Sequence, residues 1–199
     1  LGLNAQSLVI EVASNDGYLL KNFVAAGIPC LGIEPTDSTA EAAEQLGIPV
    51  LREFFGEALG RQLTAKGQQA DLIAGNNVYA HVPDINGFVA GLALLLGPQG
   101  VLSVECPHLL NLVDQVQFDT IYHEHYSYIS LTAANNVLER AGLRIFDVEE
   151  LPTHGGSLRV YAQRADGGMK QVTPAVSRML EKEKSAGVTD PAFYAGLQA

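Results

Sequence analysis

The sequence predicts an α/β fold, built on a mostly parallel sheet that ends in an antiparallel hairpin. Through residue 142, short apolar runs alternate with longer amphipathic stretches, which is the pattern of repeated strand–helix units. Two further apolar runs, at 143–151 and 157–164, are separated only by the turn-forming residues PTHGG. Strand–helix units favour parallel pairing, and the short turn favours the final hairpin.

The first half of the chain contains the leading strand–helix units. We expect strands at 7–13, 30–35, 49–53 and 70–76, since each is a short apolar run bounded by breaking or polar residues. Amphipathic stretches predict helices at 17–27, 37–47 and 57–66. Gly27 is suited to end the first helix, and Asp37 or Ser38 to cap the second.

The second half completes the sheet. A helix is expected at 85–97, a strand at 100–107 and a helix at 132–142 with Gly142 as its stop, followed by the hairpin. From residue 174 onward the sequence predicts an exposed helix and a linker. Five strand–helix units and a hairpin are the chain order of the class I methyltransferase fold, a Rossmann variant. Ligands of such sheets bind over the carboxyl ends of the first strands.

Composition limits the classes of function. Hydrophobic residues make up 47% of the 199 residues, which indicates a folded protein with a core. The net charge is −10, so nucleic acid and anionic membrane surfaces are disfavoured as partners, because affinity for either depends on clustered Lys and Arg. Small anions stay possible, because backbone N–H groups can bind them. No protein partner is indicated.

The two cysteines and the chain ends give expectations about compartment and extent. Cys30 and Cys106 lie in apolar runs without a CxxC pattern, so two buried free thiols in the cytoplasm are favoured over a disulfide. There is no basic-then-apolar leader and no apolar run near 18 residues, so we expect neither secretion nor a membrane span. The start at Leu1 and the end on FYAGLQA predict a piece of a longer protein.

The first strand-to-helix loop, within EVASNDGYLL (11–20), is a candidate cofactor loop. A dinucleotide site favours G-x-G-x-x-G there, whereas this loop has only Gly17. Asp16 at the helix start would repel a pyrophosphate but can pair with an ammonium group. S-adenosylmethionine, which has an amino-acid tail and no phosphate, therefore fits better than NAD. The alternative is that Ser14, Asn15 and Asp16 only cap a helix.

Two further strand ends overhang the same edge. Glu34 follows the second strand and can accept hydrogen bonds from ribose hydroxyls, although it could also be a solvated acid before Pro35. GNNVYAHVPD (75–84) follows the fourth strand and could also be a turn of Asn and Asp residues. The residues expected to bind the cofactor are Glu11, Ala13, Ser14, Asn15, Asp16, Gly17, Glu34, Phe54, Asn76 and Asn77.

The stretch FDTIYHEHYSYIS (118–130) gathers histidines, tyrosines and a glutamate. His123 and His125 could ligate a metal with His81, His108 or His154, but no spacing template fits. The stretch could also be a polar surface strand with half-buried aromatic rings. The third interpretation is a general acid–base cluster, since His titrates near neutral pH and Tyr hydroxyls can donate to an oxyanion.

Several stretches together resemble the sugar C-methyltransferases of deoxysugar pathways: IEVASNDGYLL, GIEP, NNVYAHVPD, FDTIYHEHYSY and THGGSLRVY. The resemblance runs from about Leu8 to Tyr161. That family methylates nucleotide-linked 4-keto sugars at the carbon beside the ketone, using S-adenosylmethionine. The resemblance implies that residues 1–166 form the cofactor domain and that residues 167–199 form a helix and a linker leading to a C-terminal domain. Zinc would belong only to an N-terminal domain, and no metal site is expected in this chain.

The same resemblance implies roles for single residues. His125 would be the base that removes the proton beside the ketone, with Tyr122 and Glu124 positioning sugar and base. His81 would reach the sugar or its keto oxygen, and His123 receives no role. A regular strand would place Tyr122 and Glu124 on one face and His125 on the other, so the segment must be irregular if all three serve one pocket.

Three other functions stay open from sequence. An O- or N-methyltransferase of another small molecule would need a base but no enolate stabilisation. A non-catalytic module could hold the adenosyl cofactor or a nucleotide for a partner. An NAD oxidoreductase is disfavoured by the absent glycine motif.

Overall fold

The computed structural model describes residues 1–198, and the side chains of residues 1–195. Seven strands form one sheet in the order β3-β2-β1-β4-β5-β7-β6. The first five strands are parallel, whereas β7 is antiparallel to both β5 and β6. The strands are β1 (Val9–Val12), β2 (Cys30–Ile33), β3 (Val50–Leu51), β4 (Ala70–Asn76), β5 (Leu96–Pro107), β6 (Leu143–Leu151) and β7 (Ser157–Arg164). The predicted fold class is confirmed.

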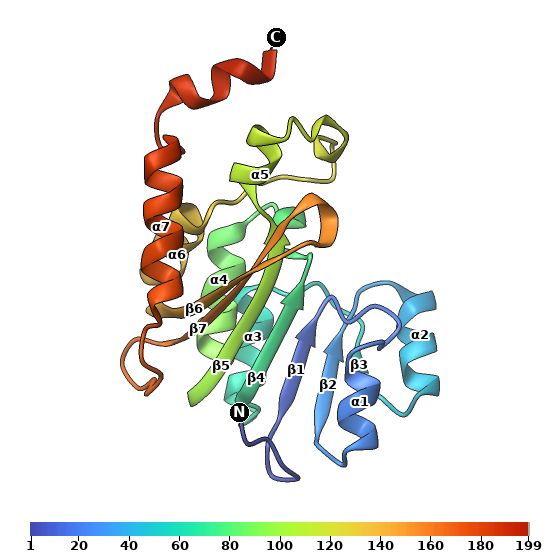
Figure 1. The fold of residues 1–199 in the computed structure, drawn as a ribbon. Coiled ribbons are helices and arrows are strands. Elements are labelled where there is room, and N and C mark those ends of the chain that lie inside the picture. Colours follow the sequence, from blue (N-terminus) through green and yellow to red (C-terminus); the bar gives the residue numbers. More distant parts are fainter. Residues whose placement is uncertain (199) are drawn as a thin grey trace.

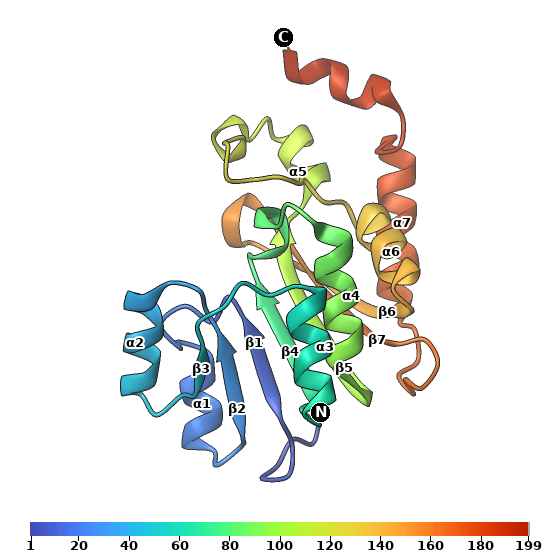
Figure 2. The same ribbon diagram turned by 180° about the vertical axis from the view of Figure 1, so that it is seen from behind.

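Helices cover the sheet on both faces (Figure 1, and from behind in Figure 2). The α-helices are α1 (Leu20–Ala25), α2 (Asp37–Gln45), α3 (Glu57–Ala65), α4 (Ile85–Leu95), α5 (Leu109–Asp114), α6 (Leu131–Arg140) and α7 (Pro174–Ala186). Short 3₁₀ turns are η1 (Tyr79–His81), η2 (Phe118–Thr120), η3 (Thr153–Gly155) and η4 (Pro191–Gln198). Side chains of α3, α4, α6 and α7 belong to the larger core cluster, and those of α1 and α2 to a smaller one.

Strand β1 shows why the sheet has these two cores. Side chains alternate between the faces of a strand. Ile10 and Val12 belong to the larger cluster, and Val9 to the smaller one. Cys30 and Cys106 are buried and free, as predicted. Within residues 1–198, every helix is too short or too polar to cross a bilayer.

The helices differ from the expectations at three points. The helix after residue 174 is exposed on one face only, because Val176, Met179 and Glu183 on the other face of α7 are buried. The N-cap of α2 is Thr36, which makes no side-chain cap bond, and Asp37 is already helical. Helix α5 was not predicted, since its six residues are too few to show a helical period. The last residue of the expected 167–199 region, Ala199, lies outside the described residues.

The carboxyl ends of the parallel strands meet at one edge of the sheet, at the top of Figure 1. Between β5 and α6 the chain leaves the sheet, passes over this edge and returns. We refer to this excursion as the 109–130 segment. An isolated parallel bridge between His108 and Ile129 joins its two ends.

Candidate active site

The loop after β1 adopts the left-handed backbone conformation at every second residue. The φ angle is +58° at Ala13, +51° at Asn15 and +78° at Gly17. A Cβ is strained in this region, so glycine normally occupies it. A Cβ on Gly17 would also collide with the side chain of Ile48. Glycine would adopt this conformation without strain at all three positions, but only Gly17 is a glycine, so the backbone is strained at Ala13 and Asn15.

The polar residues of this loop do not cap a helix, so that alternative was wrong. Helix α1 begins at Leu20 and receives no side-chain cap. Instead, the Asn15 Oδ1 atom accepts from the amide of Asp16 at 2.8 Å, and Asp16 Oδ1 accepts from the amide of Tyr18 at 3.2 Å. These bonds stabilise the turn itself.

Three of the residues predicted for the cofactor bury a polar atom that has no partner. Such atoms are rare in folded proteins, because each one loses its hydrogen bonds to water. Burial, and then the nearby Asp16, raise the pKa of Glu11 to about 8. Within the described residues the unpartnered buried side-chain atoms are Glu11 Oε2, Ser14 Oγ and Asn77 Oδ1, together with Tyr79 Oη and His108 Nδ1. The first three are consistent with a polar cofactor bound beside this loop.

Glu34 links the first loop to the end of β2. Its Oε2 atom accepts from the amide of Asn15 at 3.1 Å, and Oε1 accepts from the amide of Thr36 at 2.9 Å. The residue is only 7% exposed, so the alternative of a solvated strand-end acid was wrong. Each carboxylate oxygen still has a lone pair for a ribose hydroxyl.

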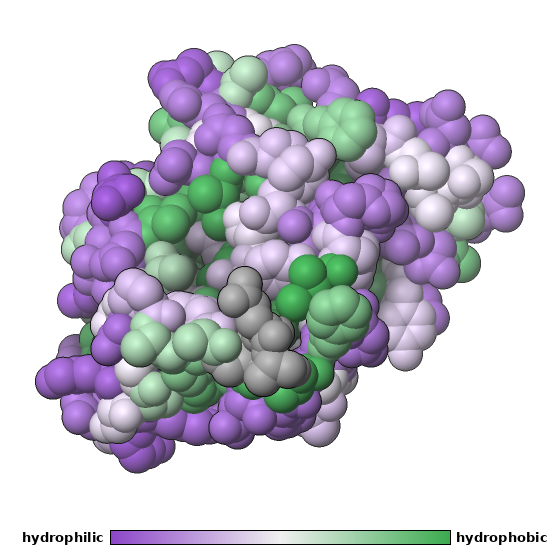
Figure 3. Space-filling model, turned by 90° about the horizontal axis from the view of Figure 1, so that it is seen from above, coloured by the Kyte–Doolittle hydropathy of each residue, from purple (hydrophilic) through white to green (hydrophobic). Residues whose placement is uncertain are grey.

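A cavity of about 960 Å³ lies beside Glu34 and contains four of the predicted residues, Ala13, Glu34, Phe54 and His81. Apolar side chains form much of its wall, and Glu53, Glu57 and Asp84 add negative charge. Figure 3, which looks onto this end of the molecule, shows hydrophobic residues in a recess between hydrophilic lobes. An apolar wall with several acids fits a cationic adenosyl compound and disfavours a pyrophosphate. We refer to this cavity as the cofactor cleft.

A second cavity, of about 450 Å³, lies between the 109–130 segment and the turn η3. Tyr122, His125 and Asn77 line it, and His81 lines both this cavity and the cofactor cleft. The two cavities therefore meet at one imidazole. We refer to the second one as the substrate cavity.

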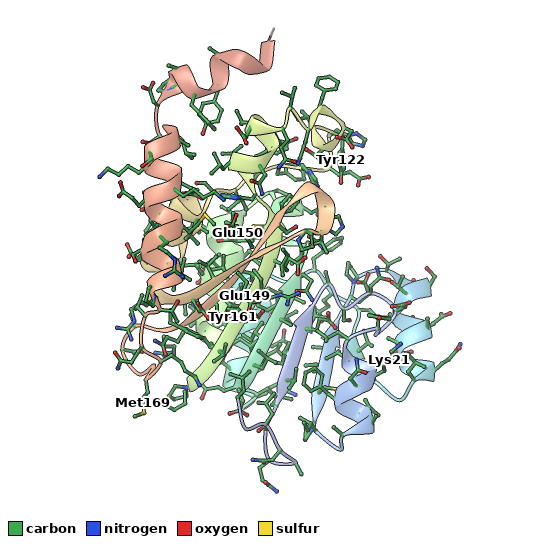
Figure 4. The ribbon with its side chains drawn as sticks, viewed as in Figure 1. Lys21, Tyr122, Glu149, Glu150, Tyr161 and Met169 are labelled. Carbon is green, nitrogen blue, oxygen red and sulfur yellow. The ribbon has the colours of Figure 1, made fainter. Side chains whose placement is uncertain are left out.

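The 109–130 segment is irregular where the cluster lies. It contains η2 and a turn closed by the His125 amide, which donates to the Tyr122 carbonyl at 3.0 Å. The Tyr126 amide donates to the carbonyl of Ala80 at 2.9 Å and so ties the turn to η1. The predicted irregularity is confirmed, and the surface-strand alternative was wrong. Figure 4 shows Tyr122 in this turn, above the carboxyl ends of the strands.

His125 is hydrogen-bonded at both ring nitrogens. Its Nδ1 lies 2.9 Å from the carbonyl oxygen of Thr120, and its Nε2 lies 2.9 Å from the hydroxyl of Tyr122. A carbonyl only accepts hydrogen bonds, so Nδ1 carries the proton. In the neutral ring Nε2 is then the acceptor, and the Tyr122 hydroxyl donates to it. The arrangement prepares Nε2 as a base.

His81 is held in the same way. Its Nδ1 lies 3.1 Å from the carbonyl oxygen of Glu124, and its ring centroid lies 4.7 Å from that of His125. The structure thus brings His81, Tyr122 and His125 together. Glu124 contributes its carbonyl to this arrangement, while its carboxylate is not among the groups lining either cavity.

Several cofactor candidates are not among the residues that line the cleft, namely Glu11, Ser14, Asn15, Asp16, Gly17 and Asn76. Other residues that line the substrate cavity were not predicted to bind substrate, including Gln117, Asp119, Thr120 and His154. The sequence did hold one indication for His154, because it lies in the turn-forming stretch PTHGG. In the structure its φ angle is +52°. Within the described residues, no group of three or more His, Cys, Asp or Glu could hold a metal ion.

Comparison with known proteins identifies families and solved structures that this chain resembles. The family described as "Methyltransferase domain" matches residues 2–148, and the "C-methyltransferase C-terminal domain" family matches residues 152–199. The C-methyltransferase NovU of Streptomyces niveus is 37% identical over 98% of this chain, which covers 46% of that protein. The chain therefore spans about half the length of this relative.

Solved structures share the fold at low sequence identity. Magnesium protoporphyrin IX methyltransferase from Synechocystis PCC 6803 with bound SAH has a TM-score of 0.62 and 16% identity, over 79% of this chain and 74% of that one. An S-adenosylmethionine-dependent methyltransferase described as putative, from Listeria monocytogenes, has a TM-score of 0.63 and 11% identity, over 80% and 91%. By its fold and by the family model that matches most of its length, the chain belongs to the S-adenosylmethionine-dependent methyltransferases of class I.

Proposed function

We propose that the protein carrying this chain methylates the carbon beside the ketone of a nucleotide-linked 4-keto deoxysugar, through an enolate. The observation that carries the proposal is the hydrogen-bond chain from Tyr122 through His125 to Thr120, at a cavity that meets the cofactor cleft. The relationship to C-methyltransferases supports carbon as the acceptor atom. Carbon becomes a nucleophile only after it loses a proton, so a positioned base is the first requirement.

His125 meets that requirement. Nε2 accepts the proton beside the ketone, and the Thr120 carbonyl stabilises the imidazolium through Nδ1–H. Because Nδ1 is already fixed, the ring does not have to change tautomer before it acts.

Tyr122 stabilises the enolate. Its hydroxyl turns from Nε2 to the keto oxygen when the sugar binds, which frees the base and supplies a hydrogen bond to the developing negative charge. His81, with Nδ1 already donating to Glu124, presents Nε2 as a second contact to the sugar. A positioning role for the Glu124 carboxylate stays a prediction.

The cofactor would lie in the cleft between the first loop and Phe54. Glu34 would accept its ribose hydroxyls, Asp16 would pair with its ammonium group, and Phe54, at 86% exposure, offers a ring for stacking. When bound, S-adenosylmethionine supplies an electrophilic methyl group. Glu11, Ser14 and Asn77 fit as a polar second layer, since each has an unpartnered buried atom.

We also propose that residues 1–166 are the cofactor domain and that 167–199 lead to a C-terminal domain, with zinc confined to an N-terminal domain. The nucleotide of the sugar would be held partly by those flanking domains. We expect the protein to work in the cytoplasm.

The test uses the full-length protein with a nucleotide-linked 4-keto deoxysugar in deuterated water. Without a methyl donor, deuterium should enter at the carbon beside the ketone, and with S-adenosylmethionine a new carbon–methyl bond should appear by NMR. Methylation at oxygen or nitrogen without this exchange would contradict the proposal.

A further inference from the structure

A carboxylate distant in sequence binds both ends of the 109–130 segment. Glu183 lies on α7, and its side chain has 0% exposure, as has that of His108. Neither residue lines the cofactor cleft or the substrate cavity. A buried carboxylate held by polar partners contributes little net stability compared with apolar packing, so this pair calls for another explanation.

The entry of the segment is bound on one side of this carboxylate. His108 Nε2 lies 2.8 Å from Glu183 Oε1, and the His108 amide donates to the carbonyl of Gly156 at 3.0 Å. The next residue, Leu109, donates its amide to the carbonyl of Ile129 at 3.0 Å. The entry is thereby fixed to α7, to the η3 turn and to the exit of the same segment.

The exit is bound on the other side. Glu183 Oε1 accepts from the amide of Leu131, and Oε2 accepts from the amide and the hydroxyl of Thr132 at 2.8 and 2.6 Å. These are the first residues of α6, so the carboxylate also interacts favourably with the positive end of that helix. Burial opposes ionisation of Glu183, but the bonds from His108 and Thr132 outweigh it and lower the pKa of the carboxyl.

We propose that Glu183 and His108 are positioning residues for methyl transfer. By fixing the two ends of the 109–130 segment, they set where Tyr122 and His125 lie over the carboxyl ends of the strands. Helix α7 thereby controls the catalytic turn from a distance, without contact to either substrate. The inference depends on the proposed function, since it assigns these residues to the same base.

The test compares Glu183→Ala with Met179→Ala. Met179 lies one turn earlier on α7 and is also buried, at 4% exposure, but packs in the larger core. Both variants should lose stability. Only Glu183→Ala should speed hydrogen exchange selectively in peptides of the 109–130 segment, and only it should lower kcat, by about 10- to 100-fold, as expected for a misplaced base. The affinity for S-adenosylhomocysteine should change less than about threefold in both variants, because neither Glu183 nor Met179 lines the cofactor cleft.

Glu183→Gln provides a second variant should the alanine variant not fold. It keeps one acceptor oxygen, so its kcat and its segment exchange should lie between wild type and Glu183→Ala. Equal kcat in the two alanine variants, or exchange that rises throughout both proteins alike, would overturn the proposal. A wild-type protein that methylates no keto sugar would contradict only the proposed function, and the exchange data would still decide whether Glu183 holds the segment.

Discussion

The hydroxyl of Tyr122 lies 2.9 Å from Nε2 of His125, so the basic nitrogen of the imidazole already accepts a hydrogen bond from a phenol. A ketone that enters the substrate cavity offers the hydroxyl a second acceptor. Under the proposed mechanism, the Tyr122 hydroxyl exchanges its hydrogen bond to His125 for one to the ketone, so that binding of the ketone frees the base. This relationship makes the roles of the two residues separable by experiment.

Replacing His125 should remove the base without weakening the cofactor site. In the full-length protein, His125→Ala should lower turnover about 10²–10⁴-fold, the usual share of a positioned base. The affinity for S-adenosylhomocysteine, measured by calorimetry, should hardly change. Deuterium uptake beside the ketone should be lost with turnover, and uptake at the wild-type rate would exclude His125 as the base. His123→Ala, at the exposed neighbouring position, is the matched control and should retain activity.

Tyr122→Phe should separate enolate stabilisation from proton removal. The phenylalanine frees Nε2 but cannot donate to the keto oxygen, so exchange should be slowed but still measurable, at a cost of roughly 3 kcal/mol in the barrier. Complete loss of exchange in Tyr122→Phe, with exchange retained in His125→Ala, would reverse the assignment of the base.

Glu34→Ala should weaken cofactor binding. The loss of a carboxylate that accepts ribose hydroxyls should cost roughly 1.5–3 kcal/mol in binding free energy, the range for hydrogen bonds to charged groups. Calorimetry with S-adenosylhomocysteine measures it, with Glu139→Ala on the exposed side of α6 as the control. An unchanged affinity would contradict the assignment, and NADH binding at micromolar concentration would contradict the choice of cofactor.

Ala13→Gly should stabilise the protein. Ala13 has a φ of +58°, where a Cβ costs about 1–2 kcal/mol and glycine is strain-free, partly offset by the greater freedom of glycine in the unfolded chain. We expect a net gain of about 0.5–1 kcal/mol in denaturant unfolding. Ala42→Gly, inside helix α2, should instead lose about 1 kcal/mol. A loss of stability in Ala13→Gly would mean that the alanine methyl is needed for packing.

The buried Glu11 should make stability depend on pH. Its pKa rises from 4.5 to about 8 in the fold, so the folded state binds more protons than the unfolded one between these values. Stability should therefore fall as pH rises from about 4.5 to 8, in total by on the order of a few kcal/mol. Glu11→Gln should flatten this slope in thermal melts, whereas Glu139→Gln should retain it. Parallel slopes in wild type and Glu11→Gln would contradict the shift.

The fold could be predicted because the relevant signal is local. Strands β6 and β7 match the predicted ranges 143–151 and 157–164. Two apolar runs of this length on either side of a short turn are compatible with few structures other than a hairpin. The burial of one face of α7 could not be predicted, because it depends on how α7 packs against β6 and α6, which the sequence of α7 does not specify. Likewise, nothing in the residue type of Ala13 signals a left-handed backbone.

The candidate site was predictable as a set of residues and not as a geometry. The sequence placed Tyr122 and His125 in one cluster, but only the turn between them brings hydroxyl and imidazole into contact. The role of the Thr120 carbonyl could not be predicted from sequence, because every residue has a backbone carbonyl. Glu183 is separated from His108 by 75 residues, so no spacing rule could pair them.

The shared wall at His81 bears on the kinetic order of the reaction. Because the cofactor cleft and the substrate cavity meet at one side chain, both ligands can be held at the same time. The cysteines offer no intermediate carrier: burial raises the pKa of Cys106 to about 12 and also raises that of Cys30. The methyl group should thus pass in a single step within a ternary complex, with inversion at its carbon. Steady-state plots for the two substrates should accordingly intersect and not run parallel.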